Sequence, residues 1–76
     1  MDINKKVAER LYELRKKSGL TSEKLAWSAN LSKSCVSYAQ KGTFDTKISS
    51  LYAMCKAMNI TLAEFFSTFT EEFEDK

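Results

Sequence analysis

The residue types that perform covalent catalysis or hold metal ions are sparse in this sequence. There are two cysteines, Cys35 and Cys55, and no histidine. Without histidine, the chain lacks the usual general base of a nucleophilic triad and any mixed histidine and cysteine zinc site. The two glycines, Gly19 and Gly42, stand apart, so no glycine-rich phosphate loop is present. We therefore expect no catalytic residues, no metal, no cofactor and no enzymatic activity.

The charged residues are unevenly distributed along the chain. Residues 1–66 contain eleven Lys and Arg against six Asp and Glu, whereas residues 67–76 contain four acids and one lysine. The net charge of +2 therefore divides into a mildly basic body and an acidic tail. A basic body is compatible with binding to phosphate groups, but a balance this small does not demonstrate it.

Size and composition indicate one compact helical domain. Seventy-six residues allow a single domain, and 43% apolar residues without any proline are atypical of a disordered chain or a turn-rich β sandwich. No signal peptide is evident, and no apolar run approaches the roughly 18–20 residues of a membrane span. We expect a cytoplasmic protein with reduced thiols, in which Cys35 is partly buried and Cys55 belongs to the core.

Apolar residues recur at helical spacing in five segments. The predicted helices lie at about residues 3–18, 22–29 and 33–41, along Ile48, Leu51, Cys55 and Met58, and from Thr61 onward. The second and third helices are short and are joined by a turn of three or four residues. That is the proportion of a helix-turn-helix.

Start and stop signals separate these segments. Thr21, Ser32 and Thr61 are suited to capping helix N-termini, and either Asp45 or Thr46 could cap the fourth helix. Helix ends are marked by residues that tolerate positive φ, namely Gly19, Asn30, Gly42 and Asn59. Local signals and periodicity agree, which supports the five-helix interpretation.

Two segments, RLYELRKKSGLTSEKLAWSANLSKSCVSYAQKG and ISSLYAMCKAMNITLAEFF, carry a family resemblance. The first resembles the three opening helices of the Cro and phage-repressor type of helix-turn-helix domain, the XRE family, and the second resembles its last two helices. Together they cover about residues 5–67. Most of the matching positions are core or cap positions, so they specify the fold more directly than the function.

The resemblance implies an all-α, five-helix lambda-repressor-like domain at residues 1–68, with its helix-turn-helix formed by the second and third helices. Residues 69–76 would form a short acidic tail or extend the last helix. The implied function is sequence-specific binding to double-stranded DNA by a transcriptional regulator, in the first place a repressor. Such proteins bind as homodimers to inverted repeats, with half-site centres about 34 Å apart.

Site residues follow from the resemblance by position. The helix that begins at Lys33 would lie in the major groove, and the helix that begins at Ser22 would cross the backbone with its N-terminal amides toward a phosphate. The candidates for reading bases are Lys33, Ser34, Ser37 and Tyr38. The candidates for contacting the DNA backbone are Arg15, Thr21, Ser22, Lys41 and Thr43. No membrane and no small-molecule ligand are implied.

Two departures from the family pattern lie on the DNA-facing side. Ser22 stands where the family usually has a glutamine that reaches a phosphate, so this interaction would be shorter or absent. Gln40 stands where the family often has a glutamate paired with Arg15. A hydrogen bond could replace that ion pair, and Arg15 would then be held less firmly.

Aromatic residues motivate two further expectations. Trp27 is expected to pack against a neighbouring helix, because tryptophan is usually well buried. The alternative is that it faces water, as the corresponding family position usually does, and that the exposed indole marks a contact surface. Phe65, Phe66 and Phe69 would form a dimer interface if the last helix continues past Ser67, with Phe73 left open. The alternative function is a protein-interaction module on the same fold with weak or no DNA reading. It is motivated by the altered Ser22 and Gln40, by Trp27 and by the acidic tail.

Overall fold

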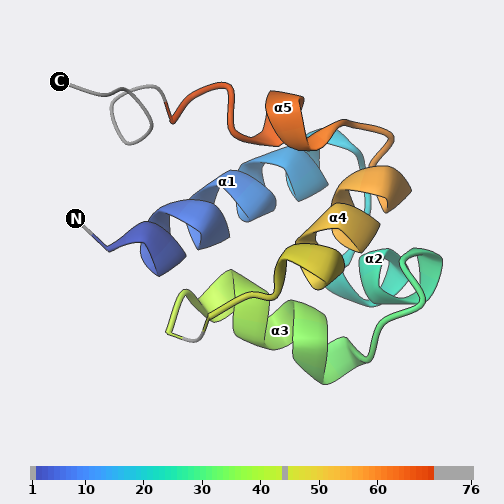
Figure 1. The fold of residues 1–76 in the computed structure, drawn as a ribbon. Helices are drawn as coiled ribbons and strands as arrows, with labels where there is room; N and C mark the ends of the chain where they lie inside the picture. Colours follow the sequence, from blue (N-terminus) through green and yellow to red (C-terminus); the bar gives the residue numbers. More distant parts are fainter. Residues whose placement is uncertain (1, 44, 70–76) are drawn as a thin grey trace, which may run out of the picture.

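The computed structural model describes residues 2–43 and 45–69, and these form five helices without strands. The helices are α1 (Ile3–Lys17), α2 (Ser22–Ser28), α3 (Lys33–Lys41), α4 (Ile48–Ala57) and α5 (Leu62–Phe65). α1 packs against α3 and α5, and α2 packs against α3 and α4. As Figure 1 shows, α3 and α5 lie at opposite ends of the molecule, with α1 and α4 between them. The predicted all-α fold with five helices is confirmed.

Three of the helices begin at the predicted hydroxyl caps. Thr21, Ser32 and Thr61 accept hydrogen bonds from the backbone N–H three residues ahead, at 3.1, 3.1 and 3.0 Å. These bonds satisfy amide groups that have no partner within the helix. α4 is different, because Lys47 occupies its N-cap position without a side-chain bond. Neither Asp45 nor Thr46 caps it, and the Asp45 carboxylate instead accepts a 2.7 Å hydrogen bond from the Asn4 side chain of α1.

The predicted stop residues all adopt positive φ. The angles are 74° at Gly19, 58° at Asn30, 72° at Gly42 and 60° at Asn59. Gly42 also serves packing, because a Cβ at this position would lie 3.0 Å from Lys5 Cα and 3.2 Å from Ala8 Cβ. The absence of a side chain lets the end of α3 approach α1 closely.

One apolar core joins all five helices. Its fully buried side chains include Leu11 of α1, Leu25 of α2, Val36 of α3, Met54 of α4 and Phe65 of α5. Cys55 is buried as predicted. The apolar stripe expected on α4 is buried except for its first residue. Ile48, at the start of the helix, is 65% exposed.

The end of the described chain folds back onto the core instead of continuing as a helix. α5 ends at Phe65, and a turn carries Phe69 to a position where it is only 1% exposed. The rings of Phe65, Phe66 and Phe69 contact one another, with centroids 5.0–6.2 Å apart. The expectation that the helix continues past Ser67, and that Phe69 lies beyond the reach of a five-helix unit, is therefore wrong. Phe73 and the rest of 70–76 lie outside the described residues.

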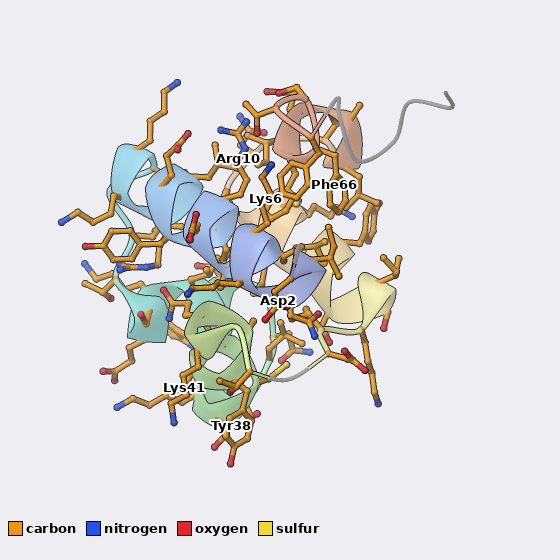
Figure 2. All side chains as sticks on the ribbon, turned by 90° about the vertical axis from the view of Figure 1, so that its left-hand side faces the viewer. Asp2, Lys6, Arg10, Tyr38, Lys41 and Phe66 are labelled. Atoms are coloured by element: carbon orange, nitrogen blue, oxygen red, sulfur yellow. The ribbon has the colours of Figure 1, made fainter. Side chains whose placement is uncertain are left out.

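Arg10 of α1 fixes this turn. Its guanidinium donates hydrogen bonds to the carbonyl oxygens of Phe65 at 2.8 Å and Glu64 at 2.9 Å, and it forms an ion pair with Glu13 at 2.6 Å. Carbonyl groups at the end of a helix lack partners within the helix, so a charged donor there is favourable. In Figure 2, Arg10 and Lys6 of α1 lie in the same half of the molecule as Phe66 and α5.

Candidate nucleic-acid interface

The four predicted base-reading residues lie together on the outer face of α3. Lys33, Ser34, Ser37 and Tyr38 line one open groove, which Lys41 completes. Val36 and Ala39 occupy the opposite face and are buried at 0% and 4% exposure. This division follows from the helical period, because the buried pair at i and i+3 fixes which residues point outward.

The exposed face of α3 is a surface of hydrogen-bond donors with positive charge. α3 contains two lysines and no acidic residue. The Lys41 ammonium lies 5.4 Å from the centre of the Tyr38 ring, which is itself 49% exposed. Figure 2 shows both side chains projecting from α3 at the end of the molecule remote from α5. Lysine, serine and tyrosine side chains can all donate to base edges or phosphate oxygens.

Two of the predicted backbone-contact residues belong to one hydrogen-bonded chain. Arg15 Nε donates to Gln40 Oε1 at 2.7 Å, and Gln40 Nε2 donates to Ser22 Oγ at 2.8 Å. A second guanidinium nitrogen of Arg15 donates to the Leu20 carbonyl oxygen at 2.8 Å. The expected replacement of the ion pair by a hydrogen bond is confirmed. Besides Gln40, the Leu20 carbonyl oxygen and the Tyr12 ring, 5.3 Å away, contact the Arg15 guanidinium.

The remaining backbone candidates lie at the ends of α2 and α3. Thr21 and Lys41 are exposed at the start of α2 and the end of α3, and Thr43 is exposed just after Gly42. A second groove, between α2 and the start of α3, is lined by Thr21, Glu23, Lys24, Ala26, Trp27, Leu31 and Lys33. The candidates thus lie along the two helices of the helix-turn-helix.

Trp27 lies in this second groove and is 85% exposed. The expectation that it packs against a neighbouring helix is therefore wrong. The adjacent Ala26 and Leu25 fill the space between α2 and the core, at 3% and 0% exposure. With those two residues inward, the helical period directs the next residue outward.

Two lysines that the sequence did not single out adjoin the candidate surface. Lys24 lines the second groove with Thr21 and Lys33, and Lys5 lines a third with Gln40 and Lys41. The position of Lys24 could be predicted from the sequence, because Lys24 follows Thr21 by three residues and so lies on the same helix face. The position of Lys5 could not, because it depends on the packing of α1 against α3.

The cysteines do not form a reactive centre. Burial raises the pKa of the Cys55 thiol from 9.0 to about 11. Cys35 is partly buried, as predicted, and its sulfur donates to Ser50 Oγ at 3.7 Å. Within 2–43 and 45–69, no group of three or more metal-ligating side chains gathers at one place. In the same residues, no helix combines the length and apolar character that a membrane crossing requires.

Fold and surface together define a helix-turn-helix domain, with α2 and α3 as its two helices. No protein-family model matches the chain, and no curated protein does. Among solved structures, the chain is similar to the restriction-modification controller protein C.Esp1396I, in two mutants that replace one tyrosine by phenylalanine or by alanine. Both align with a TM-score of 0.84 and 25% identity over 95% of this chain, covering 91% and 94% of theirs. The likeness confirms, at the level of the fold, the resemblance to Cro-type regulators.

Proposed function

We propose that the chain binds double-stranded DNA by placing α3 in the major groove, and that it regulates transcription as a homodimer on an inverted repeat. The outer face of α3 is the observation that carries the proposal. It presents lysine, serine and tyrosine donors in one row, without an acidic residue to repel DNA. The likeness to a restriction-modification controller protein, a class of DNA-binding transcriptional regulators, supports the same function.

Each α3 side chain suits a distinct kind of contact. Lys33 at the start of the helix can reach the O6 and N7 acceptors of a guanine, which is a contact that specifies sequence. Ser34 and Ser37 are short and can pair with several base edges, so they discriminate little on their own. Tyr38 can touch a thymine methyl group with its ring or a phosphate with its hydroxyl.

Backbone contacts would come from both sides of α3. Thr21 and Ser22 lie at the start of α2, whereas Lys41 and Thr43 lie at the far end of α3. Contacts of this kind fix the register of the protein on the duplex and carry no sequence information. We therefore assign sequence reading to Lys33, with the serines and Tyr38 refining it.

The dimer interface that we propose is narrower than the sequence indicated. Phe65 and Phe69 are 0% and 1% exposed within one chain, so their burial needs no partner. Phe66 is the only one of the three that is partly exposed. We propose that it lies at the contact between two copies, and light scattering of Phe66→Ala, with Ile48→Ala as an exposed control on α4, tests this. An unchanged mass for Phe66→Ala at every concentration would contradict it.

One observation favours the alternative, a protein-interaction module on this fold. Trp27 is 85% exposed, and large exposed aromatic side chains are characteristic of binding surfaces. The two functions differ in their response to salt. Neutralising several phosphates makes DNA affinity fall steeply as salt rises, whereas a contact centred on an indole ring responds weakly.

DNA binding is tested with a fluorescein-labelled pool of 30-base-pair duplexes of random sequence. Fluorescence anisotropy measures how much of the pool the protein binds at two salt concentrations. We expect retention at low salt and a steep loss at high salt, reduced in a Lys33→Ala Lys41→Ala variant. Glu23→Gln serves as the control that changes charge beside the groove without removing a lysine. No retention of DNA at low salt would refute the proposal and favour the protein-interaction alternative.

A further inference from the structure

Trp27 differs from the other exposed aromatic residues because no cation covers its ring. Tyr12, Tyr38 and Tyr52 are each about half exposed, and a lysine or arginine side chain lies 5.3–6.0 Å from the centre of each ring. Trp27 is 85% exposed, and none of the described residues places a cation over it. The indole therefore presents an open, flat π surface on the outer face of α2.

Positive charge flanks Trp27 in its groove. Lys24 lies one helical turn before Trp27 on α2, and Lys33 lines the same groove from the start of α3. Both lysines are exposed, and neither forms an ion pair with a described residue. Among the described residues that line the groove, Glu23 is the one acid. Two ammonium groups beside an open ring suit a ligand that combines an aromatic ring with negative charge.

The groove is large enough to hold one nucleotide. Its volume of about 730 Å³ falls in the range of roughly 300–1,000 Å³ that is typical of small-ligand sites. Ala26 and Leu31 contribute apolar surface to it. The Thr21 hydroxyl accepts from the Lys24 backbone N–H, so its own hydrogen remains available for an acceptor. A base stacked on Trp27 would therefore have ammonium and hydroxyl donors beside it for its phosphates.

The charged neighbours of Trp27 favour nucleic acid over a protein partner. The centre of a protein interface is depleted in charged residues, and its aromatic anchors stand in well-packed, desolvated pockets. Glu23 and Lys24 lie one turn from Trp27, and of the described residues that line the groove, Trp27 is the one large apolar side chain that is mostly exposed. A nucleic-acid strand suits this arrangement, because it combines stacking on a ring with ionic contacts to phosphates.

We propose that the groove between α2 and the start of α3 binds single-stranded DNA, with one base stacked on Trp27 and the adjacent phosphates held by Lys24 and Lys33. Stacking on an aromatic side chain accepts any base, so this site carries little sequence preference. The choice of DNA over RNA rests on the proposed function, because Lys33 lines both this groove and the α3 groove. An unpaired strand that leaves a duplex on α3 would meet Trp27 next.

Trp27 is the only tryptophan of the chain, so its fluorescence reports directly on this groove. The probe is an oligothymidylate of eight nucleotides, which forms no base pairs with itself. A base stacked on the indole ring quenches its emission, so we expect saturable quenching of the wild-type protein that high salt reverses. Inorganic phosphate at matched ionic strength should leave the emission unchanged.

Two variants with matched controls separate stacking from charge, with affinity measured by anisotropy of fluorescein-labelled oligothymidylate. Trp27→Ala should weaken binding by about fivefold to 150-fold, the effect of losing one stacked base. Lys24→Ala should flatten the slope of log affinity against log salt by about 0.7, the change for one phosphate of a single strand. Tyr52→Ala and Lys56→Ala remove the same kinds of side chain from α4, where Lys56 already covers the Tyr52 ring, and should retain the wild-type affinity and slope.

The outcomes separate this site from the proposed binding of duplex DNA. Quenching by oligothymidylate in a wild-type protein that binds no duplex would refute the proposed function and leave the stacking site standing. No quenching at low salt would overturn the stacking site, whether or not duplex DNA binds, and favour a protein partner for Trp27. Equal losses of affinity in Tyr52→Ala and Trp27→Ala would overturn the assignment to this groove. Tighter binding of oligouridylate than of oligothymidylate would overturn the choice of DNA over RNA.

Discussion

Replacing Gly42 by alanine should destabilise the fold much more than the same change at Gly19. Both glycines end a helix at nearly the same φ, 72° and 74°. A Cβ at Gly19 meets nothing within 4 Å, whereas a Cβ at Gly42 lies 3.0 Å from the backbone of α1 at Lys5. The pair therefore separates the conformational effect of losing glycine from the steric effect of bringing α3 against α1.

The magnitudes follow from these two effects. A left-handed alanine costs about 1–2 kcal/mol, and the reduced entropy of its unfolded chain returns about 0.4–1 kcal/mol. Gly19→Ala should thus lower the free energy of unfolding by about 1 kcal/mol. At Gly42, displacement of a backbone neighbour adds about 1–3 kcal/mol, as in overpacked cores. We therefore expect a decrease of about 2–4 kcal/mol for Gly42→Ala.

Urea unfolding followed by far-ultraviolet circular dichroism measures both variants. Thermal unfolding gives a second measure, because 1 kcal/mol corresponds to a shift of about 4–8 °C in the thermal midpoint of a domain of this size, so the two variants are easily resolved. Gly42→Ala should also weaken DNA binding, because it moves the end of α3 that carries Lys41. Equal decreases in stability for Gly19→Ala and Gly42→Ala would refute the close approach of α3 to α1.

Three further predictions concern Arg10, Trp27 and Cys55. Arg10→Ala should lower the free energy of unfolding by about 2 kcal/mol, because two carbonyl groups lose a charged donor. Glu13→Ala should lower it by less than about 1 kcal/mol, because it removes only an exposed ion pair. Equal urea midpoints for the two variants would contradict this prediction. Trp27→Ala should change stability by less than about 0.5 kcal/mol, and wild-type fluorescence should show the emission of an indole in water; a blue-shifted spectrum would be inconsistent with the exposed position. Burial raises the pKa of Cys55 to about 11, so the unfolded state ionises first above pH 9, and stability should decline from pH 9 to 11 by an amount that Cys55→Ala removes. The same pH dependence in wild type and Cys55→Ala would argue against a buried thiol.

Features that depend on neighbouring residues could be predicted from the sequence. The caps at Thr21, Ser32 and Thr61 act on amides three residues away. The left-handed stops at Gly19 and Gly42 likewise follow from the residue type, because glycine has no Cβ to clash. Cap and stop signals together placed the helices of the helix-turn-helix to within about two residues.

Features that depend on contacts between distant segments could not be predicted from the sequence. Asp45 could not be distinguished from Thr46 as a cap, because its partner Asn4 lies at the other end of the chain. Burial of Trp27 is the expectation from its residue type, whereas the family position usually faces water; its exposure follows from the core contacts of Leu25 and Ala26 on the other face of α2. Phe69 returns to the core through a turn after α5, and no helical periodicity extends across such a turn.

The candidate site shows the same division. The row of Lys33, Ser34, Ser37 and Tyr38 follows from one helix and its period, and the structure brings the row together. The link from Gln40 to Ser22 joins two helices through one amide, and only the folded arrangement shows it. Sequence resemblance indicated that positions 15 and 40 would interact, but not that the Gln40 amide would also contact Ser22.

Sequence-specific DNA binding by α3 is tested by selecting bound sequences from a random double-stranded DNA pool. We predict enrichment of an inverted repeat whose half-site centres lie about 34 Å apart, with a sequence preference that changes in Lys33→Ala. Protection of two half-sites by one dimer should follow on the enriched duplex. A pool that remains random after repeated rounds, from protein that is shown to be folded, would contradict sequence-specific binding by this helix.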